Sequence, residues 1–208
     1  MSPVSPERPR LAVRRLSVQT RLVRLQAVTE AEKRALGRLV RRLPQPIATT
    51  AVTVGEGSKG SIIWLVSATG LSLLGRRGRL GAGGGLVAAG LASALANGPV
   101  KWAVRRPRPH GAALAGLRRG GDSPGTSSFP SGHTASAVAF SVAATAEYPL
   151  AATVLVPAAL CVALARMRTL RHYPSDVLGG AVIGAAIGAG TAYSLRRYRT
   201  WRTSPHPA

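Results

Sequence analysis

The chain has 208 residues, which is enough for one domain with a tail. Lys and Arg number 28 against seven Asp and Glu, so the formal net charge is +21. A surplus of this size indicates an anionic partner, such as nucleic acid, an acidic bilayer surface or a phosphorylated substrate. The single cysteine, Cys161, excludes an intramolecular disulfide, and the Arg-rich N-terminus lacks the central apolar region of a secretory signal.

A basic region over residues 1–60 comes first. Residues 29–32 (Thr-Glu-Ala-Glu) predict a capping box, in which the side chain of Glu32 returns to the amide of the first residue. The amphipathic helix that follows ends at Pro44, and its apolar face consists of Leu36, Leu39, Val40 and Leu43. Two interpretations stay open, a helix on an acidic bilayer surface and a helix packed on its own protein. We expect no nucleic acid partner, because we find no recognised binding motif and few aromatic residues.

Five apolar runs follow, and they lie at residues 61–75, 80–100, 133–147, 149–165 and 177–195. They are long and lack strand-like alternation, so they predict helices, and a membrane span takes about 20 residues. A soluble helical core would need amphipathic outer helices, for which the chain has too few polar faces. We therefore expect an all-α integral-membrane bundle of about five transmembrane helices over residues 61–195. The basic amphipathic helix precedes it, and a basic tail over residues 196–208 follows.

Small residues recur at every fourth position in two of these runs, which allows helix backbones to approach closely in lipid. The positions are Gly180, Gly184 and Gly188 in the last run, and Gly81, Gly85 and Ala89 in the second. Aromatic residues near the ends of the runs are expected to be interfacial anchors. These residues are Trp64, Trp102, Tyr148 and Tyr193.

The distribution of cations bears on the orientation in the membrane. With five spans, residues 1–60 and three polar segments share one face, and that face holds 21 of the 28 Lys and Arg. The positive-inside tendency would place this face in the cytoplasm, although some of these cations are expected to bind phosphate instead. We expect a multi-pass protein of the cell membrane, and the side that the polar segments face stays open.

Two of the polar segments supply groups suited to anion binding. In residues 101–109, Lys101 and Arg108 can hold a phosphate as a point charge and a bidentate fork, although a basic loop beside a span is usually a topology signal. In the second segment Ser131 is a natural N-cap, followed by Gly132 and His133. The free amides and the positive end of such a helix form an anion site within reach of the histidine.

The third polar segment adds Arg166 at the end of the fourth run, then His172 and Asp176 four residues apart. The carboxylate of Asp176 can accept the proton of one ring nitrogen of His172. That hydrogen bond would fix the tautomer and leave the other nitrogen free to attack an electrophile. The alternative is a His–Asp pair that only caps a helix, since ionisable groups at membrane edges are common.

Together the three segments carry a spacing that neither a topology signal nor a cap explains. Lys, six residues and Arg-Pro are followed by Pro-Ser-Gly-His, and then by Arg, five residues, His, three residues and Asp. This pattern resembles the type 2 phosphatidic acid phosphatase superfamily, which also includes vanadium haloperoxidases. The resemblance covers about residues 61–195. The chain departs from the family at Ala165, where a serine is common, and in having five apolar runs where many membrane members have six.

The resemblance implies a role for each residue of the pattern. His172 would be the nucleophile that forms a phosphohistidine, and Asp176 would orient it. His133 would protonate the leaving oxygen and then activate water. The phosphate cradle would consist of Lys101, Arg108, Ser131, Gly132 and Arg166. The resemblance implies no metal or other cofactor.

These roles predict a membrane lipid phosphatase. Its substrate would be phosphatidic acid, a polyprenyl diphosphate or a polyprenyl-linked sugar phosphate, and the Ala-, Arg- and Gly-rich composition looks like that of actinobacterial members. One alternative is a haloperoxidase that uses bound vanadate, although that branch is soluble. Another is a non-enzymatic basic membrane anchor, in which His133 and His172 would be replaceable. The sequence does not indicate an oligomeric state.

Overall fold

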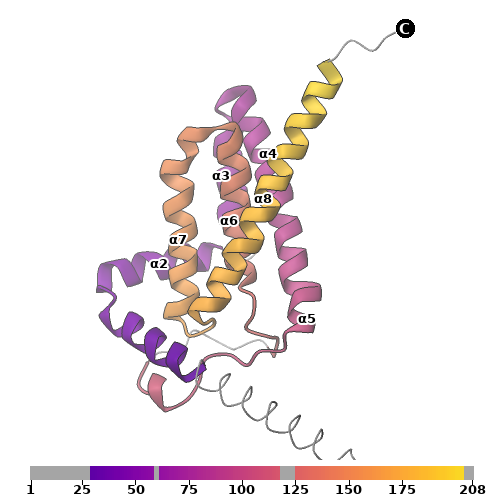
Figure 1. Ribbon diagram of the computed structural model, residues 1–208. Helices are drawn as coiled ribbons and strands as arrows, with labels where there is room; N and C mark the ends of the chain where they lie inside the picture. Colours follow the sequence, from indigo (N-terminus) through magenta and orange to yellow (C-terminus); the bar gives the residue numbers. More distant parts are fainter. Residues whose placement is uncertain (1–28, 59–60, 118–124, 204–208) are drawn as a thin grey trace, which may run out of the picture.

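The computed structural model describes residues 29–58, 61–117 and 125–203, and all regular structure in these ranges is helical (Figure 1). The bundle consists of α3 (Ile62–Ser72), α4 (Gly75–Leu95), α6 (Gly132–Glu147), α7 (Ala152–Arg168) and α8 (Pro174–Thr203). Short helices η2 (Ala96–Val100) and α5 (Lys101–Ala103) extend α4, η3 (Ala112–Leu114) lies in the following loop, and η4 (Pro149–Ala151) leads into α7. The expected all-α architecture is confirmed, and each apolar run corresponds to one helix.

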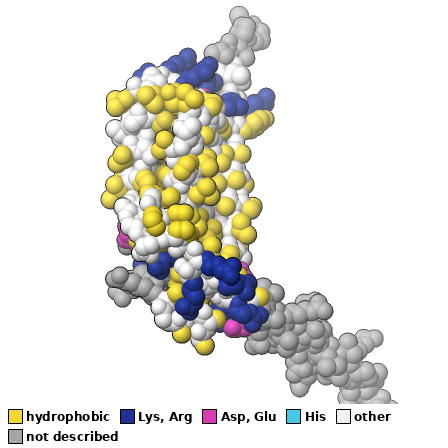
Figure 2. Space-filling view, turned by 90° about the vertical axis from the view of Figure 1, so that its left-hand side faces the viewer, with side chains coloured by type: hydrophobic (Ala, Val, Ile, Leu, Met, Phe, Trp, Pro, Cys, Tyr) yellow, Lys and Arg dark blue, Asp and Glu magenta, His cyan; other side chains and the backbone are white. Residues whose placement is uncertain are grey.

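Three of these helices are long and apolar enough to cross a membrane: Gly75–Ala103, Pro149–Arg168 and Pro174–Arg202. α3 is apolar but has only 11 residues. α6 has 16 residues, and most of its side chains are buried between the other helices. Figure 2 shows the apolar side chains in a band between two ends rich in Lys and Arg. The membrane bundle is therefore confirmed. Of the five expected spans, three correspond to helices that are long and apolar enough to cross a membrane.

The central helix, α6, packs mainly against α4 and α8. Glycines of α8 make the closest approach: a Cβ atom at Gly180, Gly184 or Gly188 would collide with backbone carbonyl oxygens of α6. On the opposite face of α6, a Cβ atom at Gly85 of α4 would lie 2.9 Å from the ring of Phe140. The predicted small-residue packing is confirmed, and it holds the start of α6 against the start of α8.

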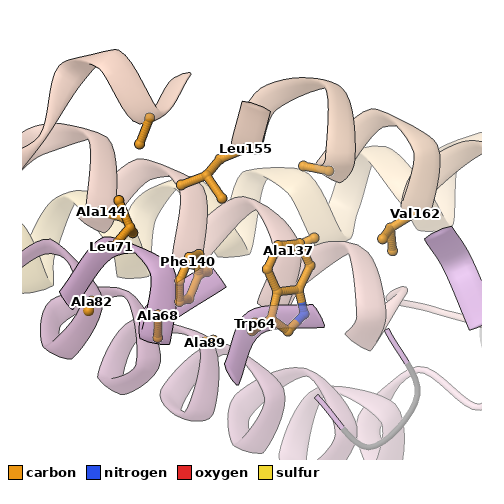
Figure 3. Close-up of a cluster of buried hydrophobic side chains, with 12 residues drawn as sticks. Trp64, Ala68, Leu71, Ala82, Ala89, Ala137, Phe140, Ala144, Leu155 and Val162 are labelled. Atoms are coloured by element: carbon orange, nitrogen blue, oxygen red, sulfur yellow. The ribbon is translucent and has the colours of Figure 1, made fainter. Parts of the chain in front are cut away.

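A buried cluster between α3, α4, α6 and α7 forms the centre of the bundle (Figure 3). Trp64 lies in it, 1% exposed, with its ring centroid 5.3 Å from that of Phe140. The expectation that Trp64 anchors the chain at the interface is therefore wrong, because the third residue of the short helix α3 faces α6. Trp102 and Tyr193 are exposed at 76% and 65%, in keeping with that role, whereas Tyr148 packs partly against the cluster.

The N-terminal helix over residues 29–42 and α2 (Gln45–Gly57) lie at the lower end of the bundle in Figure 1. Leu36 and Val40 of the first helix are buried in a cluster with Leu114, Leu170 and Tyr173. The helix thus packs on its own protein, in agreement with the second of the two interpretations of its amphipathic pattern.

Candidate active site

The three polar segments meet at the end of the bundle where α4 ends and α6 and α8 begin, which we call the site end. Gly98 and Pro99 interrupt α4 there with a π-helical segment, and the backbone of Gly98 is non-helical. The break is followed at once by Lys101, whose Nζ donates to Oδ1 of Asn97 at 2.8 Å. A Cβ atom at Gly132 would collide with the Asn97 side chain, so the start of α6 packs directly against this turn.

The loop after α5 brings the second expected cation into place. The amide of Ser128 donates to the carbonyl of Arg106 at 2.8 Å, which ties the segment before α6 to this loop. Arg108 then reaches the α7–α8 connection, where its Nη1 donates to the carbonyl of Arg171 at 2.8 Å. Arg108 and His172 are therefore neighbours, although 63 residues separate Arg108 from Arg171 in the chain.

Ser131 occupies the N-cap position of α6, as predicted, but its side chain caps no amide of the helix. Its hydroxyl instead accepts from the hydroxyl of Thr134 at 2.9 Å. The amide of Ser131 donates to the carbonyl of Asp176 at 2.9 Å. The side chain of Ser131 therefore leaves the backbone amides of the first helical turn, beginning with Gly132, able to bind an anion.

His172 is buried, and its orientation differs from the expected one. Its Nδ1 lies 2.6 Å from the carbonyl oxygen of Ser128 and 3.8 Å from Oδ2 of Asp176. Because a carbonyl only accepts, Nδ1 carries the proton and donates to Ser128, and Nε2 keeps its lone pair. Asp176 contributes a nearby negative charge rather than the hydrogen bond. Burial lowers the pKa of His172 against the opposing effect of Asp176, so the ring is neutral at pH 7.

Asp176 is held by a residue that the sequence analysis did not single out. Nη1 of Arg106 donates to Oδ1 of Asp176 at 2.7 Å and to the hydroxyl of Ser175 at 2.6 Å. Its Nη2 pairs with Glu32 of the N-terminal helix. Its guanidinium also lies 4.2 Å from the ring centroid of Tyr173. An ion-pair chain thus runs from the N-terminal helix to the carboxylate beside His172.

The side chain of Glu32, which the sequence places in a capping box, also binds residues that are distant in the chain. Oε2 of Glu32 pairs with Arg106, and Oε1 accepts from the amide of Ser175 at 3.2 Å. Only seven carboxylates face 28 cations in this chain, so a carboxylate near the site has many candidate partners. That scarcity was the available signal for a long-range role of Glu32.

Arg166 is 2% exposed, and its Nη2 donates to the carbonyl of Gly55 in α2 at 2.6 Å. Its Nε is buried and has no hydrogen-bond partner among the described residues. A buried donor of this kind needs an acceptor, which a phosphate oxygen would supply. The departure at Ala165 has a packing reason, because a Cβ atom at Gly55 would collide with the Ala165 side chain. A small residue at position 165 leaves room for α2 to pack against α7.

The expected site residues therefore converge. His133 lies within electrostatic range of Lys101, Arg166 and His172, and Lys101 within range of Arg108 and Asp176. Two hollows adjoin this cluster and share Asn97: a groove of about 720 Å³ that includes Lys101 and Arg108, and a cavity of about 190 Å³ beside His133. Among the described residues, no three His, Cys, Asp or Glu side chains are grouped to hold a metal ion.

Comparisons with known proteins agree with this geometry. The PAP2 superfamily matches residues 82–201. A relative in two strains of Mycobacterium tuberculosis, decaprenylphosphoryl-5-phosphoribose phosphatase, is 40% identical over 145 residues, covering 67% of this chain and 76% of the relative.

The fold is also similar to a solved structure, that of a transmembrane PAP2 type phosphatidylglycerolphosphate phosphatase from Bacillus subtilis. The TM-score is 0.58 at 21% identity, and the alignment covers 82% of this chain and 87% of the other. That likeness supports the fold, and the family match spans more than half of the chain. The protein therefore belongs to the PAP2 superfamily.

Proposed function

We propose that this membrane lipid phosphatase removes a terminal phosphate from a polyprenyl-linked sugar, through a phosphohistidine on His172. The observation that carries the proposal is the neutral, buried ring of His172, whose Nδ1 donates to the Ser128 carbonyl and whose Nε2 keeps its lone pair. The ring lies within electrostatic range of Arg108 and of His133, and His133 lies within range of Arg166 and Lys101, at the end of an apolar helical bundle.

The first step is attack of the Nε2 lone pair of His172 on phosphorus, while the bond from phosphorus to the leaving oxygen breaks. The ring gains positive charge as the N–P bond forms. The carbonyl dipole of Ser128, 2.6 Å from Nδ1, and the carboxylate of Asp176, 3.8 Å away, both stabilise that charge. Burial and the neighbouring cations keep His133 neutral in the empty site, so His133 takes a proton from the phosphate monoester as it binds. It gives this proton to the departing oxygen, and the sugar leaves as an alcohol.

The second step releases phosphate. His133, now without its proton, accepts one from a water molecule, whose oxygen attacks phosphorus as the N–P bond breaks. Inorganic phosphate leaves, and His172 returns to its neutral form with the proton still on Nδ1. In both steps Lys101, Arg108 and Arg166, together with the amide of Gly132, hold the non-bridging oxygens.

The cavity beside His133 supports a sugar as the leaving group. Side chains with hydroxyl or amide groups form most of its lining, and they are Ser58, Ser61, Ser93, Asn97 and Ser136. A site of this kind suits a leaving group with several hydroxyls and is costly to fill with an apolar one. The Mycobacterium tuberculosis relative is named for a phosphoribose linked to a polyprenyl phosphate.

The position of the site suits a lipid substrate, because the tail of the lipid can stay in the bilayer while the headgroup enters the site at the end of the bundle. We place the enzyme in the cell membrane, with the charge distribution favouring a cytoplasmic site. Labelling of Arg38→Cys in a Cys161→Ala background by a membrane-impermeant thiol reagent in intact cells tests the side. Arg38 is exposed on the N-terminal helix at the site end, and protection from the reagent is the expected result.

The activity itself is tested with purified, detergent-solubilised protein and EDTA. Phosphate release is measured from a polyprenyl-phosphoryl pentose phosphate, a polyprenyl diphosphate and phosphatidic acid. We expect the sugar phosphate to give the highest kcat/KM. His172→Ala should abolish release and the acid-labile phosphoenzyme. His206→Ala, at a histidine close to the C-terminus of the sequence, should retain both.

Each outcome separates the parts of the proposal. A preference for phosphatidic acid or the diphosphate would contradict the sugar as the leaving group, while the phosphohistidine mechanism would still stand. Full activity of His172→Ala would exclude this histidine as the nucleophile.

A further inference from the structure

The opposite end of the bundle carries a second cluster of cations, which we call the arginine end. A cavity of about 960 Å³ lies between the start of α4, the α6–α7 turn and the last turns of α8. Five guanidinium groups line it, those of Arg76, Arg77, Arg196, Arg199 and Arg202. None of the catalytic or phosphate-binding residues described above lies at this end.

The lining of this cavity includes a single carboxylate, Glu147 at the end of α6. Nη1 of Arg199 donates to Oε2 of Glu147 at 2.7 Å, and Nε of Arg196 lies 3.7 Å from Oε1. One carboxylate balances one of five cations, so the cavity keeps a strong positive potential. Its ligand must therefore be an anion.

A second, apolar groove of about 550 Å³ runs between α4 and α8, along the side of the bundle. Its lining includes Val87 and Leu91 of α4, and Ile187 and Leu195 of α8. Tyr198 lines both the groove and the arginine cavity, so the two hollows adjoin. A molecule that fills both must join an anionic head to an apolar chain.

The arginine end also lies where the headgroups of a bilayer would be. Figure 2 shows Lys and Arg directly beyond the apolar band, and α8 extends past the neighbouring helices in Figure 1. Its last turns carry Tyr198 and Trp201, which are 54% and 60% exposed. Exposed aromatic residues beside arginines are typical of the membrane–water interface.

We infer that this end binds an anionic phospholipid of the adjacent leaflet. Its phosphate lies among the arginines, and one acyl chain lies in the groove between α4 and α8. Basic pockets between membrane helices are suited to anionic headgroups. This inference does not rest on the proposed substrate, because the two sites lie at opposite ends of the bundle.

Native mass spectrometry of the purified protein, titrated with phosphatidylglycerol or with phosphatidylcholine, tests the inference. We expect tighter binding of phosphatidylglycerol, and the double variant Arg76→Gln/Arg77→Gln should weaken it by roughly tenfold or more. Gly190→Leu tests the groove separately, because a Cβ atom at Gly190 meets nothing within 4 Å and a leucine there would fill it. It should reduce binding of both lipids.

Matched controls separate this site from the cations at the site end. Arg38→Gln removes an exposed arginine of the N-terminal helix, and Gly70→Leu adds a side chain at a glycine of α3 that also has open space. Both should bind phosphatidylglycerol as the unmodified protein does. Binding unchanged in the double variant and in Gly190→Leu would overturn the inference. Displacement of phosphatidylglycerol by an equal concentration of soluble glycerol phosphate would show that the acyl chain contributes nothing to binding, which also contradicts the inference.

Discussion

The two ends of the bundle hold cations in different surroundings. At the site end, Arg166 is 2% exposed and donates to a backbone carbonyl, and Arg106 is fixed by Asp176, Ser175 and Glu32. At the arginine end, Arg76 and Arg77 are exposed on the first turn of α4. Fixed donors can be aligned with a transition state, whereas exposed ones adapt to a headgroup.

This difference separates two uses of positive charge in one chain. Groups that are oriented before the substrate arrives do not have to reorganise during the reaction, so they contribute to the rate. Exposed guanidinium groups lose side-chain entropy when they bind and are screened by salt. We therefore expect substitutions at the site end to reduce turnover and substitutions at the arginine end to affect lipid binding alone.

Among the cations, the largest effect is expected at Arg166. Replacement by Gln removes the charge and the buried Nε donor, so kcat/KM should fall by about 10³-fold, the upper part of the range for one transition-state donor. Arg166→Lys keeps the charge but not the second nitrogen and should lose about 10²-fold. Phosphate release is the measurement, with Arg168→Gln in the same helical turn as the control. Equal activity of the Lys variant and the unmodified protein would show that a point charge suffices.

A smaller effect is expected along the ion-pair chain from Glu32 to Asp176. Arg106→Gln should lower kcat by about 30-fold with KM nearly unchanged, because Arg106 fixes the carboxylate beside His172 rather than the substrate. Glu32→Gln retains hydrogen-bonding atoms and should lower kcat by only about threefold. Steady-state kinetics of both variants test this, with Arg38→Gln on the same helix as control. A rise in KM at constant kcat would instead place Arg106 in contact with the substrate.

The sequence was sufficient for the features that depend on local periodicity and on spacing. Five apolar runs predicted the five bundle helices, and Gly180, Gly184 and Gly188 predicted the tight contact between α6 and α8. The spacing around His133 and His172 identified the residues that meet at the site end, although their roles stay predictions. These features could be predicted because each pattern repeats at a helical period or lies at a helix end.

The supporting residues were not predictable in this way, because each acts on a distant part of the chain. Gly55 binds Arg166 through its carbonyl, and Glu32 binds Arg106 through its carboxylate. The acceptor for His172 is a backbone carbonyl, that of Ser128, which any residue could supply. A backbone partner cannot be recognised from the residue type, because every residue has a carbonyl group. A carboxylate close to a helix start is first interpreted as a cap, and a long-range ion pair is not the expected reading.

A moderate effect on stability is expected from pH, again at the site end. The lowered pKa of His172 means that the folded state binds fewer protons than the unfolded state as the pH falls below about 6.5. The contribution of His172 to the unfolding free energy should therefore be highest above that pH and decrease below it, by at most about 1.4 kcal/mol per pH unit. Thermal denaturation between pH 8 and pH 5 measures this. His172→Gln should show a shallower decrease than the unmodified protein, and an identical slope would contradict the assignment.

The smallest effect on turnover is expected from the arginine end. Arg76→Gln/Arg77→Gln should keep kcat in detergent within about twofold, because α4 has 21 residues and so separates these charges from Lys101 by about 30 Å. That distance exceeds the Debye length of about 8 Å at physiological salt several times over. Phosphate release by the same preparation used for lipid titration gives the comparison directly. A tenfold loss of kcat in detergent would mean that α4 couples the two ends mechanically, and the separation of roles between them would then fail.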